Sequence, residues 1–167
     1  MKYIFILFCL ITKLNAQTTS NSKLNSHLLY QKNASEIYDI AEDYREQGKY
    51  RDAILTHLEV IQTTNERDFI QFLSLISAGV CYLELKDAIM AEGYLTHAMS
   101  MKPNNPSNQR TEAEFKKALN ESKSHLLYFR ALARLDLGNK KGACGDFITM
   151  DFYMEDSGKE FYVKYCR

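Results

Sequence analysis

Side chains that often carry enzyme chemistry are scattered along this sequence and form no known catalytic motif. The sequence has no Cys-x-x-Cys, no His-Glu-x-x-His and no Gly-x-Ser-x-Gly, which would indicate redox, zinc or nucleophilic chemistry. Gly138, Gly142 and Gly145 lack the spacing and the Lys-Ser/Thr ending of a phosphate-binding loop. We therefore expect no enzyme activity, no cofactor and no metal.

The remaining polar candidates have plain structural explanations. The four histidines show no metal-ligand spacing and are His27, His57, His97 and His125. Glu42, Arg45 and Glu46 have the spacing of a solvated helix surface. An enzyme that uses Cys81 or a histidine stays an alternative, but it would need a site that the sequence does not display.

A repeated spacing predicts the elements that position these side chains. Three times along the chain, a small residue is followed twelve positions later by alanine: Ala41 and Ala53, Gly79 and Ala91, Ala131 and Ala143. Two antiparallel helices approach closely only where their facing side chains are small. With only 2 prolines and 7 glycines, the chain should also be mostly helical. The spacing therefore predicts three helix pairs.

Other positions keep the same register. The middle copy is the clearest and contains Leu75, Ala78, Gly79, Tyr82, Ala91, Leu95, Ala98 and Pro103. This pattern resembles the 34-residue tetratricopeptide repeat. The resemblance implies an all-α superhelix, or solenoid, of three such units at residues 34–67, 72–105 and 124–154. In the third unit, Arg130 and Arg134 replace residues that the family usually keeps apolar, and an unrelated helical bundle is the alternative.

The repeats are unevenly spaced. The alanines of the first and second pairs are 38 residues apart, four more than the family period, and a longer second helix around Thr64 to Arg67 would absorb this excess. The alanines of the second and third pairs are 52 apart. Residues 106–123 should therefore be an inserted loop and helical extension, with Thr111 and Glu114 as a capping-box pair. We expect a longer first helix in the third unit, or a separate helix in line with it.

Residues 155–167 should form a C-terminal cap. A stacked array needs an atypical end that covers its last apolar face. Ser157 and Glu160 have the spacing of a second capping box, and Phe161 and Tyr162 follow them. We therefore expect a short helix that packs on the third pair.

Two cysteines could meet at this cap. An antiparallel cap would bring Cys166 near Cys144, and a bridge closing this loop of about 22 residues would contribute roughly 3 kcal/mol. The segment from Gly142 to Phe147, with the Lys-Tyr-Cys ending, also looks like short exported bacterial repeat proteins of this family. The sequence allows two possibilities, a disulfide between Cys144 and Cys166 or two free thiols. Cys81 lies within a predicted helix and should be buried.

The resemblance also implies a partner-binding groove. In the family, this groove is lined from four positions of each first helix, spaced as 2, 5, 9 and 12. These positions hold Ser35, Tyr38, Glu42 and Arg45, then Leu73, Ile76, Val80 and Leu83, then His125, Tyr128, Leu132 and Leu135. The second and third sets are largely aliphatic, which is typical of an interaction surface. The alternative is that residues 104–123 or an identical subunit cover them.

The first residues predict export. Residues 1–16 have the layout of a signal peptide, with Lys2 before an apolar run from Tyr3 to Ile11. That run is shorter than the roughly 20 residues of a spanning helix, so we expect no stable membrane insertion. Residues 17–33 should be a flexible lead-in. Removing Lys2 and Lys13 leaves 19 basic and 21 acidic side chains, which provides no basic surface for nucleic acid.

Together these features predict a non-catalytic protein that is periplasmic or secreted. Its partner would be a protein or peptide, with an apolar segment bound in the groove, and its role that of an adaptor or scaffold. Neither nucleic acid nor a small-molecule substrate is expected. The alternative function is a structural module that self-associates, with its groove covered by its own chain or by a second subunit.

Overall fold

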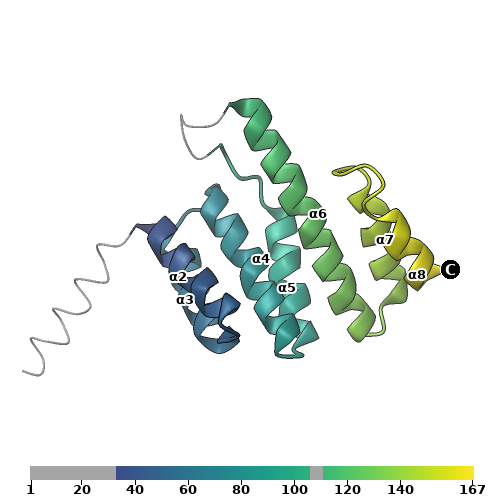
Figure 1. The fold of residues 1–167 in the computed structure, drawn as a ribbon, viewed down its shortest axis with the longest axis horizontal. Coiled ribbons are helices and arrows are strands. Elements are labelled where there is room, and N and C mark those ends of the chain that lie inside the picture. Colours follow the sequence, from purple (N-terminus) through teal and green to yellow (C-terminus); the bar gives the residue numbers. More distant parts are fainter. Residues whose placement is uncertain (1–32, 106–110) are drawn as a thin grey trace, which may run out of the picture. The chain divides into compact units, whose positions relative to one another are not determined.

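The computed structural model describes residues 33–105 and 111–167, and the predicted all-α class is confirmed for them (Figure 1). The predicted signal peptide and nearly all of the predicted lead-in lie outside the described residues. The described part contains seven helices and no strand: α2 (Ala34–Glu46), α3 (Tyr50–Thr63), α4 (Phe69–Glu84), α5 (Ala88–Ser100), α6 (Glu112–Asp136), α7 (Lys140–Met150) and α8 (Lys159–Cys166). None of these helices is long and apolar enough to cross a bilayer.

Consecutive helices pack in pairs: α2 with α3, α4 with α5, and α6 with α7. The five alanines that predicted these pairs are fully buried, namely Ala41, Ala53, Ala91, Ala131 and Ala143. At Gly79, an added Cβ atom would lie 2.7 Å from the Cγ atom of Leu95 on α5. Small residues therefore occupy close contacts, as the spacing predicted.

The turns inside the three pairs share one backbone feature. Gly48, Lys86 and Gly138 all have positive φ, at +72°, +62° and +76°. A left-handed residue after a helix lets the backbone N–H groups of the turn reach the last carbonyls of that helix. Asp87 and Asn139 then cap α5 and α7 by accepting hydrogen bonds from backbone N–H groups. Each turn thereby ends one helix and starts the next.

The seven helices are arranged in two rows plus an end helix. The inner helices, α2, α4 and α6, contact one another in order, and the outer helices α3 and α5 contact the next inner helix. The backbones of the outer helices α3, α5 and α7 do not approach one another. This arrangement is compatible with the predicted α-α superhelix.

The predicted extension of the second helix, α3, through about Thr64 to Arg67 is wrong. α3 ends at Thr63, and a turn leads to α4, which begins at Phe69. The hydroxyls of Thr63 and Thr64 donate hydrogen bonds to carbonyls of the last turn of α3. The Gln71 side chain of α4 donates to two further carbonyls, those of Ile61 and Thr64. The Gln71 side chain thus takes the carbonyl of Ile61, which the next helical turn would have used.

α6 is one uninterrupted helix of 25 residues, so the longer first helix is the arrangement present. It starts at the predicted capping box, in which Thr111 and Glu114 each bind the other's backbone N–H group. One turn later, Phe115 is buried and packs edge-on against Phe69 of α4, with ring centroids 5.4 Å apart. In Figure 1, the N-terminal part of α6 extends beyond the ends of α4 and α5.

The end helix α8 packs on α7, but its start differs from the prediction. Gly158 is the N-cap residue and no side chain caps α8, so the predicted capping box of Ser157 and Glu160 is wrong. The Ser157 hydroxyl lies 3.2 Å from that of Ser124 on α6 instead. An added Cβ atom at Gly158 would overlap the carbonyl oxygen of Phe147, so this close approach requires glycine.

Cys144 and Cys166 form a disulfide that joins α7 to the last residue of α8. Their Cα atoms are 5.8 Å apart, within the usual range for a bridge. The buried ring of Phe147 stacks on Phe161 and Tyr165 of α8. The pairing considered from the sequence is confirmed, and α8 covers an aromatic face of the last pair.

Candidate partner-binding surface

The residues predicted to line the groove lie on the three inner helices. We call them the inner stripe: Tyr38, Glu42 and Arg45 on α2, Leu73, Ile76, Val80 and Leu83 on α4, and Tyr128, Leu132 and Leu135 on α6. All except Ile76 are half-buried. Ser35 and His125, which belong to the same register, are exposed. The stripe is thus polar on α2 and mainly aliphatic on α4 and α6.

Two members of the inner stripe are less available to a partner than predicted. Ile76 is only 9% exposed and belongs to the hydrophobic core. Tyr128 lies against Phe161 of α8, with ring centroids 4.6 Å apart. The groove prediction took no account of these contacts, because they depend on how deeply α4 is packed and on where α8 docks. Val80, Leu83, Leu132 and Leu135 are the half-buried aliphatic members that extend along α4 and α6.

The polar end of the stripe surrounds a buried histidine. His57 of α3 is fully buried, and its Nε2 atom lies 3.3 Å from Oε1 of Glu42. Arg45 donates two hydrogen bonds to the other oxygen of Glu42, at 2.9 and 2.6 Å. The ring of Tyr38 packs against His57 at 5.5 Å between centroids. Neither His57 nitrogen, nor Oε1 of Glu42, has a well-aligned hydrogen bond within the described residues.

Glu42 is held as a carboxylate in this cluster. Burial acts to raise its pKa, but the polar contacts with His57, Arg45 and Ser77 outweigh it and hold the pKa at about 2. The group is therefore negatively charged over the whole physiological range. Arg45, on the same helix, largely matches its charge, and the contact of Glu42 with His57 joins α2 to α3.

We expect Glu42→Gln to remove part of the acid sensitivity of folding. Because the pKa of Glu42 is lower in the folded chain than in the unfolded chain, its stabilising effect is complete above about pH 4.5. It is lost as the pH falls toward about 2, and we expect about 1 kcal/mol, since the carboxylate is partly in water. Urea unfolding of the wild type and of the variant between these pH values measures how the free energy of unfolding depends on pH. The matched control is Glu59→Gln, which changes an exposed acid. The prediction would be contradicted if the free energy of unfolding changed with pH equally in the wild type and in Glu42→Gln.

The two arginines that depart from the family pattern belong to a buried ion-pair network. Arg130 binds Asp146 of α7 through two hydrogen bonds of 3.0 and 2.7 Å. Arg134 donates to the same carboxylate at 2.8 Å and to Glu92 of α5 at 2.8 Å. The side chain of Asp146 is only 4% exposed. The network joins α5, α6 and α7, which gives these arginines a structural role.

Cys81, the third cysteine of the described residues, is a poor nucleophile. It is fully buried, and burial raises the pKa of its thiol to about 11. The reactive thiolate is therefore scarce near neutral pH. No group of three His, Cys, Asp or Glu side chains in the described part of the chain could hold a metal ion.

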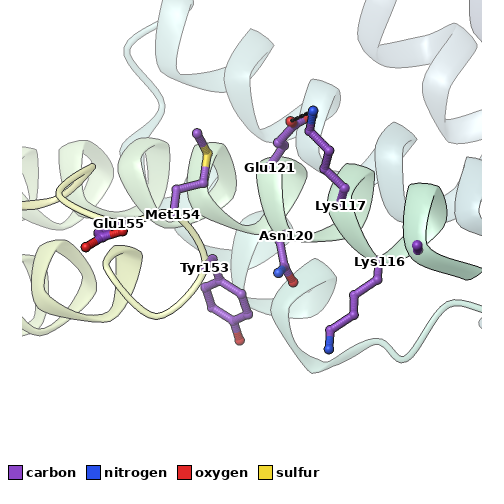
Figure 2. A pocket seen from close by; sticks show the side chains of 8 residues that line it. Lys116, Lys117, Asn120, Glu121, Tyr153, Met154 and Glu155 are labelled. Atoms are coloured by element: carbon purple, nitrogen blue, oxygen red, sulfur yellow. Dashed lines mark ion pairs between the residues drawn. The ribbon is translucent and has the colours of Figure 1, made fainter.

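One hollow lies between the start of α6 and the segment after α7. It has a volume of about 500 Å³, and its lining includes Lys116, Asn120, Tyr153 and Met154. Figure 2 shows Asn120 and Lys116 projecting on the same side as Tyr153, whereas Lys117 and Glu121 approach each other on the opposite side of the helix. Its mixed lining of exposed side chains indicates no particular ligand.

A second, more apolar hollow of about 580 Å³ lies between the outer helices α3 and α5. Leu58 and Ile61 line one wall, Met90 and Tyr94 the other, and Leu75 of α4 the floor. Ile89 also lines it and is 72% exposed. The hollow exists because the backbones of α3 and α5 do not approach each other. The sequence did not predict this hollow, although the apolar residue Ile89 at the start of α5 was a signal.

No protein-family model matches the chain, and no curated protein or solved structure matches it either.

Proposed function

We propose that this chain is a non-catalytic tetratricopeptide-type protein that binds an apolar segment of another polypeptide along the inner stripe. The observation that carries the proposal is the row of half-buried aliphatic side chains on adjacent inner helices: Leu73, Val80, Leu83, Leu132 and Leu135. Such a row in a polar surface is typical of an interaction site. An extended or helical apolar peptide would fit a surface of this chemistry.

Two features support the tetratricopeptide assignment. The small residues of the three pairs are buried where the repeat pattern needs close helix approach. The turn inside each pair has its left-handed residue at the same place in the register, seven residues after Ala41, Gly79 and Ala131. Repetition of both packing and turn geometry favours one unit used three times over a bundle of unrelated helices.

The proposed location is outside the cytoplasm, in the periplasm or after secretion. The Cys144–Cys166 disulfide is compatible with an oxidising compartment. The signal-peptide pattern of residues 1–16 is the other support for this proposal.

We expect Val80→Asp combined with Leu132→Asp to abolish partner binding. Two carboxylates on the aliphatic part of the stripe would have to lose water when an apolar segment docks, which should lower recovery at least about tenfold. Pull-downs from cell-envelope extracts, quantified by mass spectrometry, compare this variant with wild type. The control is Leu55→Asp with Ile148→Asp, which changes exposed aliphatic residues of the outer helices. Equal recovery of every partner by all three proteins would show that the inner stripe is not the binding site.

The alternative is a self-associating module. Its support is the contact of Phe115 with Phe69, by which the extension of α6 already covers the start of α4. Sedimentation analysis separates the two functions, because self-association predicts a dimer or larger species that Val80→Asp with Leu132→Asp dissociates. A monomeric wild-type protein would leave partner binding as the proposed function.

A further inference from the structure

One end of the inner stripe is covered by the last helix of the chain itself. Tyr128 is the first member of the stripe on α6, and it contacts Phe161 of α8 with ring centroids 4.6 Å apart. His125, three residues before Tyr128, is exposed, and Leu132 follows four residues after it on the same face. Without the ring of Phe161, the stripe on α6 would therefore extend past Tyr128.

Few contacts hold the last turn of α8. The helix has eight residues, none of them fully buried, and helices of this length are marginal on their own. In the described part of the chain, no hydrogen bond or ion pair joins a side chain of α8 to α6 or α7. Ring contacts and the Cys144–Cys166 bond hold it instead. The disulfide is thus the one covalent hold on the helix that covers Tyr128.

The Cys144–Cys166 bond is open to reduction by a dithiol. Both cysteines are half-buried, so solvent reaches these residues. One thiolate of the dithiol attacks a sulfur atom of the bridge and forms a mixed disulfide, which the second thiolate breaks by closing the reductant's own disulfide. Two electrons and two protons pass to Cys144 and Cys166, which become two thiols.

We propose that this disulfide controls access to the Tyr128 end of the inner stripe. The inference rests on the proposed function, since it concerns the same surface. While the bond is intact, α8 keeps Phe161 on Tyr128, and a partner segment contacts only the rest of the stripe. After reduction, only ring contacts keep Phe161 there, and a partner residue of the same chemistry displaces it.

Phe161 indicates what that partner residue is. Its ring contacts two other rings, those of Tyr128 and Phe147. Tilted and offset contacts of this kind favour an aromatic ring over an aliphatic side chain of similar size. An aromatic residue beside the aliphatic part of the partner segment therefore takes the place of Phe161.

The test uses two fluorescent peptides with the same aliphatic core, one ending in phenylalanine and the other in alanine. Fluorescence anisotropy measures their affinities for the wild-type protein before and after treatment with dithiothreitol, a dithiol. The oxidised protein should bind the two peptides with similar affinity. The reduced protein should bind the phenylalanine peptide about tenfold more tightly than the alanine peptide, the effect of one well-placed aromatic contact.

Two controls separate the opening of the bridge from other effects of the reductant. Combining Cys144→Ser with Cys166→Ser should give the phenylalanine preference without dithiothreitol, and adding dithiothreitol should not change it. Hydroxyl-radical labelling, read by mass spectrometry, measures the exposure of single side chains. Labelling of Tyr128 should rise on reduction, whereas labelling of Tyr38, on the α2 part of the stripe, should stay the same.

The outcomes distinguish this inference from the proposed function. An equal preference for phenylalanine before and after reduction, or unchanged labelling of Tyr128, would overturn the control by the disulfide alone. Failure of both peptides to bind either form of the protein would overturn it together with the proposed function.

Discussion

Replacing Asp146 with alanine should lower the free energy of unfolding by about 3–5 kcal/mol, the usual effect of breaking a buried ion pair on one side. Asp146 is the acid shared by Arg130 and Arg134, so its loss leaves the Arg130 guanidinium group without a carboxylate in a mostly buried site and leaves Arg134 with Glu92 alone. Chemical denaturation followed by circular dichroism measures the change. Asp43→Ala, at an exposed position of α2, should change the stability by less than about 0.5 kcal/mol.

A second variant separates the charge effect from a simple cavity effect. Combining Asp146→Leu with Arg130→Met and Arg134→Met replaces the buried charges with apolar side chains of similar size. Only Glu92 then lacks its partner, and its side chain is 30% exposed, so this triple variant should regain most of the stability lost in Asp146→Ala. A triple variant as unstable as the single one would mean that the network contributes through packing and not through matched charge.

Replacing Cys144 and Cys166 with serine should destabilise the protein by about 3 kcal/mol, because the unfolded chain is no longer closed into a loop. The effect should be concentrated at α8, which has eight residues and none fully buried. Hydrogen exchange should therefore become faster in α8 before it changes in α4 or α5. Equal exchange in α8 with and without the bridge would contradict this account.

Alkylation of the protein lacking residues 1–16 provides the companion measurement. Without reduction, mass spectrometry should find no label on Cys144 or Cys166. Cys81 should be labelled only after unfolding, because it is buried and its thiol has a pKa of about 11. Labels on both Cys144 and Cys166 of the native protein would contradict the disulfide.

The features that were predictable from the sequence depend on short-range rules. Pairs such as Ala41 and Ala53 determine where two helices can touch, and the Thr111–Glu114 capping box determines where α6 starts. The pairing of Cys144 with Cys166 needed only a cap that turns back on the last helix. Each of these follows from the residues of one helix or of one turn.

The features that were missed depend on the angles and depths at which helices meet. Arg134 is 42 positions from Glu92, and nothing in the spacing of the two indicates an ion pair. The extra residues before α4 form a turn, and the Gln71 side chain of α4 binds the Ile61 carbonyl that a longer α3 would have used. Similarly, burial of Ile76 and the hollow between α3 and α5 depend on how the helix pairs are stacked.

The docking of α8 has a mechanical consequence. Its first end is held by the hydrogen bond from the Gly158 N–H group to the Asp151 carboxylate, and its last residue is bonded to Cys144. Because both of its ends are held, α8 cannot slide along α7 or rotate about its own axis. We therefore expect that breaking the disulfide frees the C-terminal end of α8 while its first end stays held at Gly158.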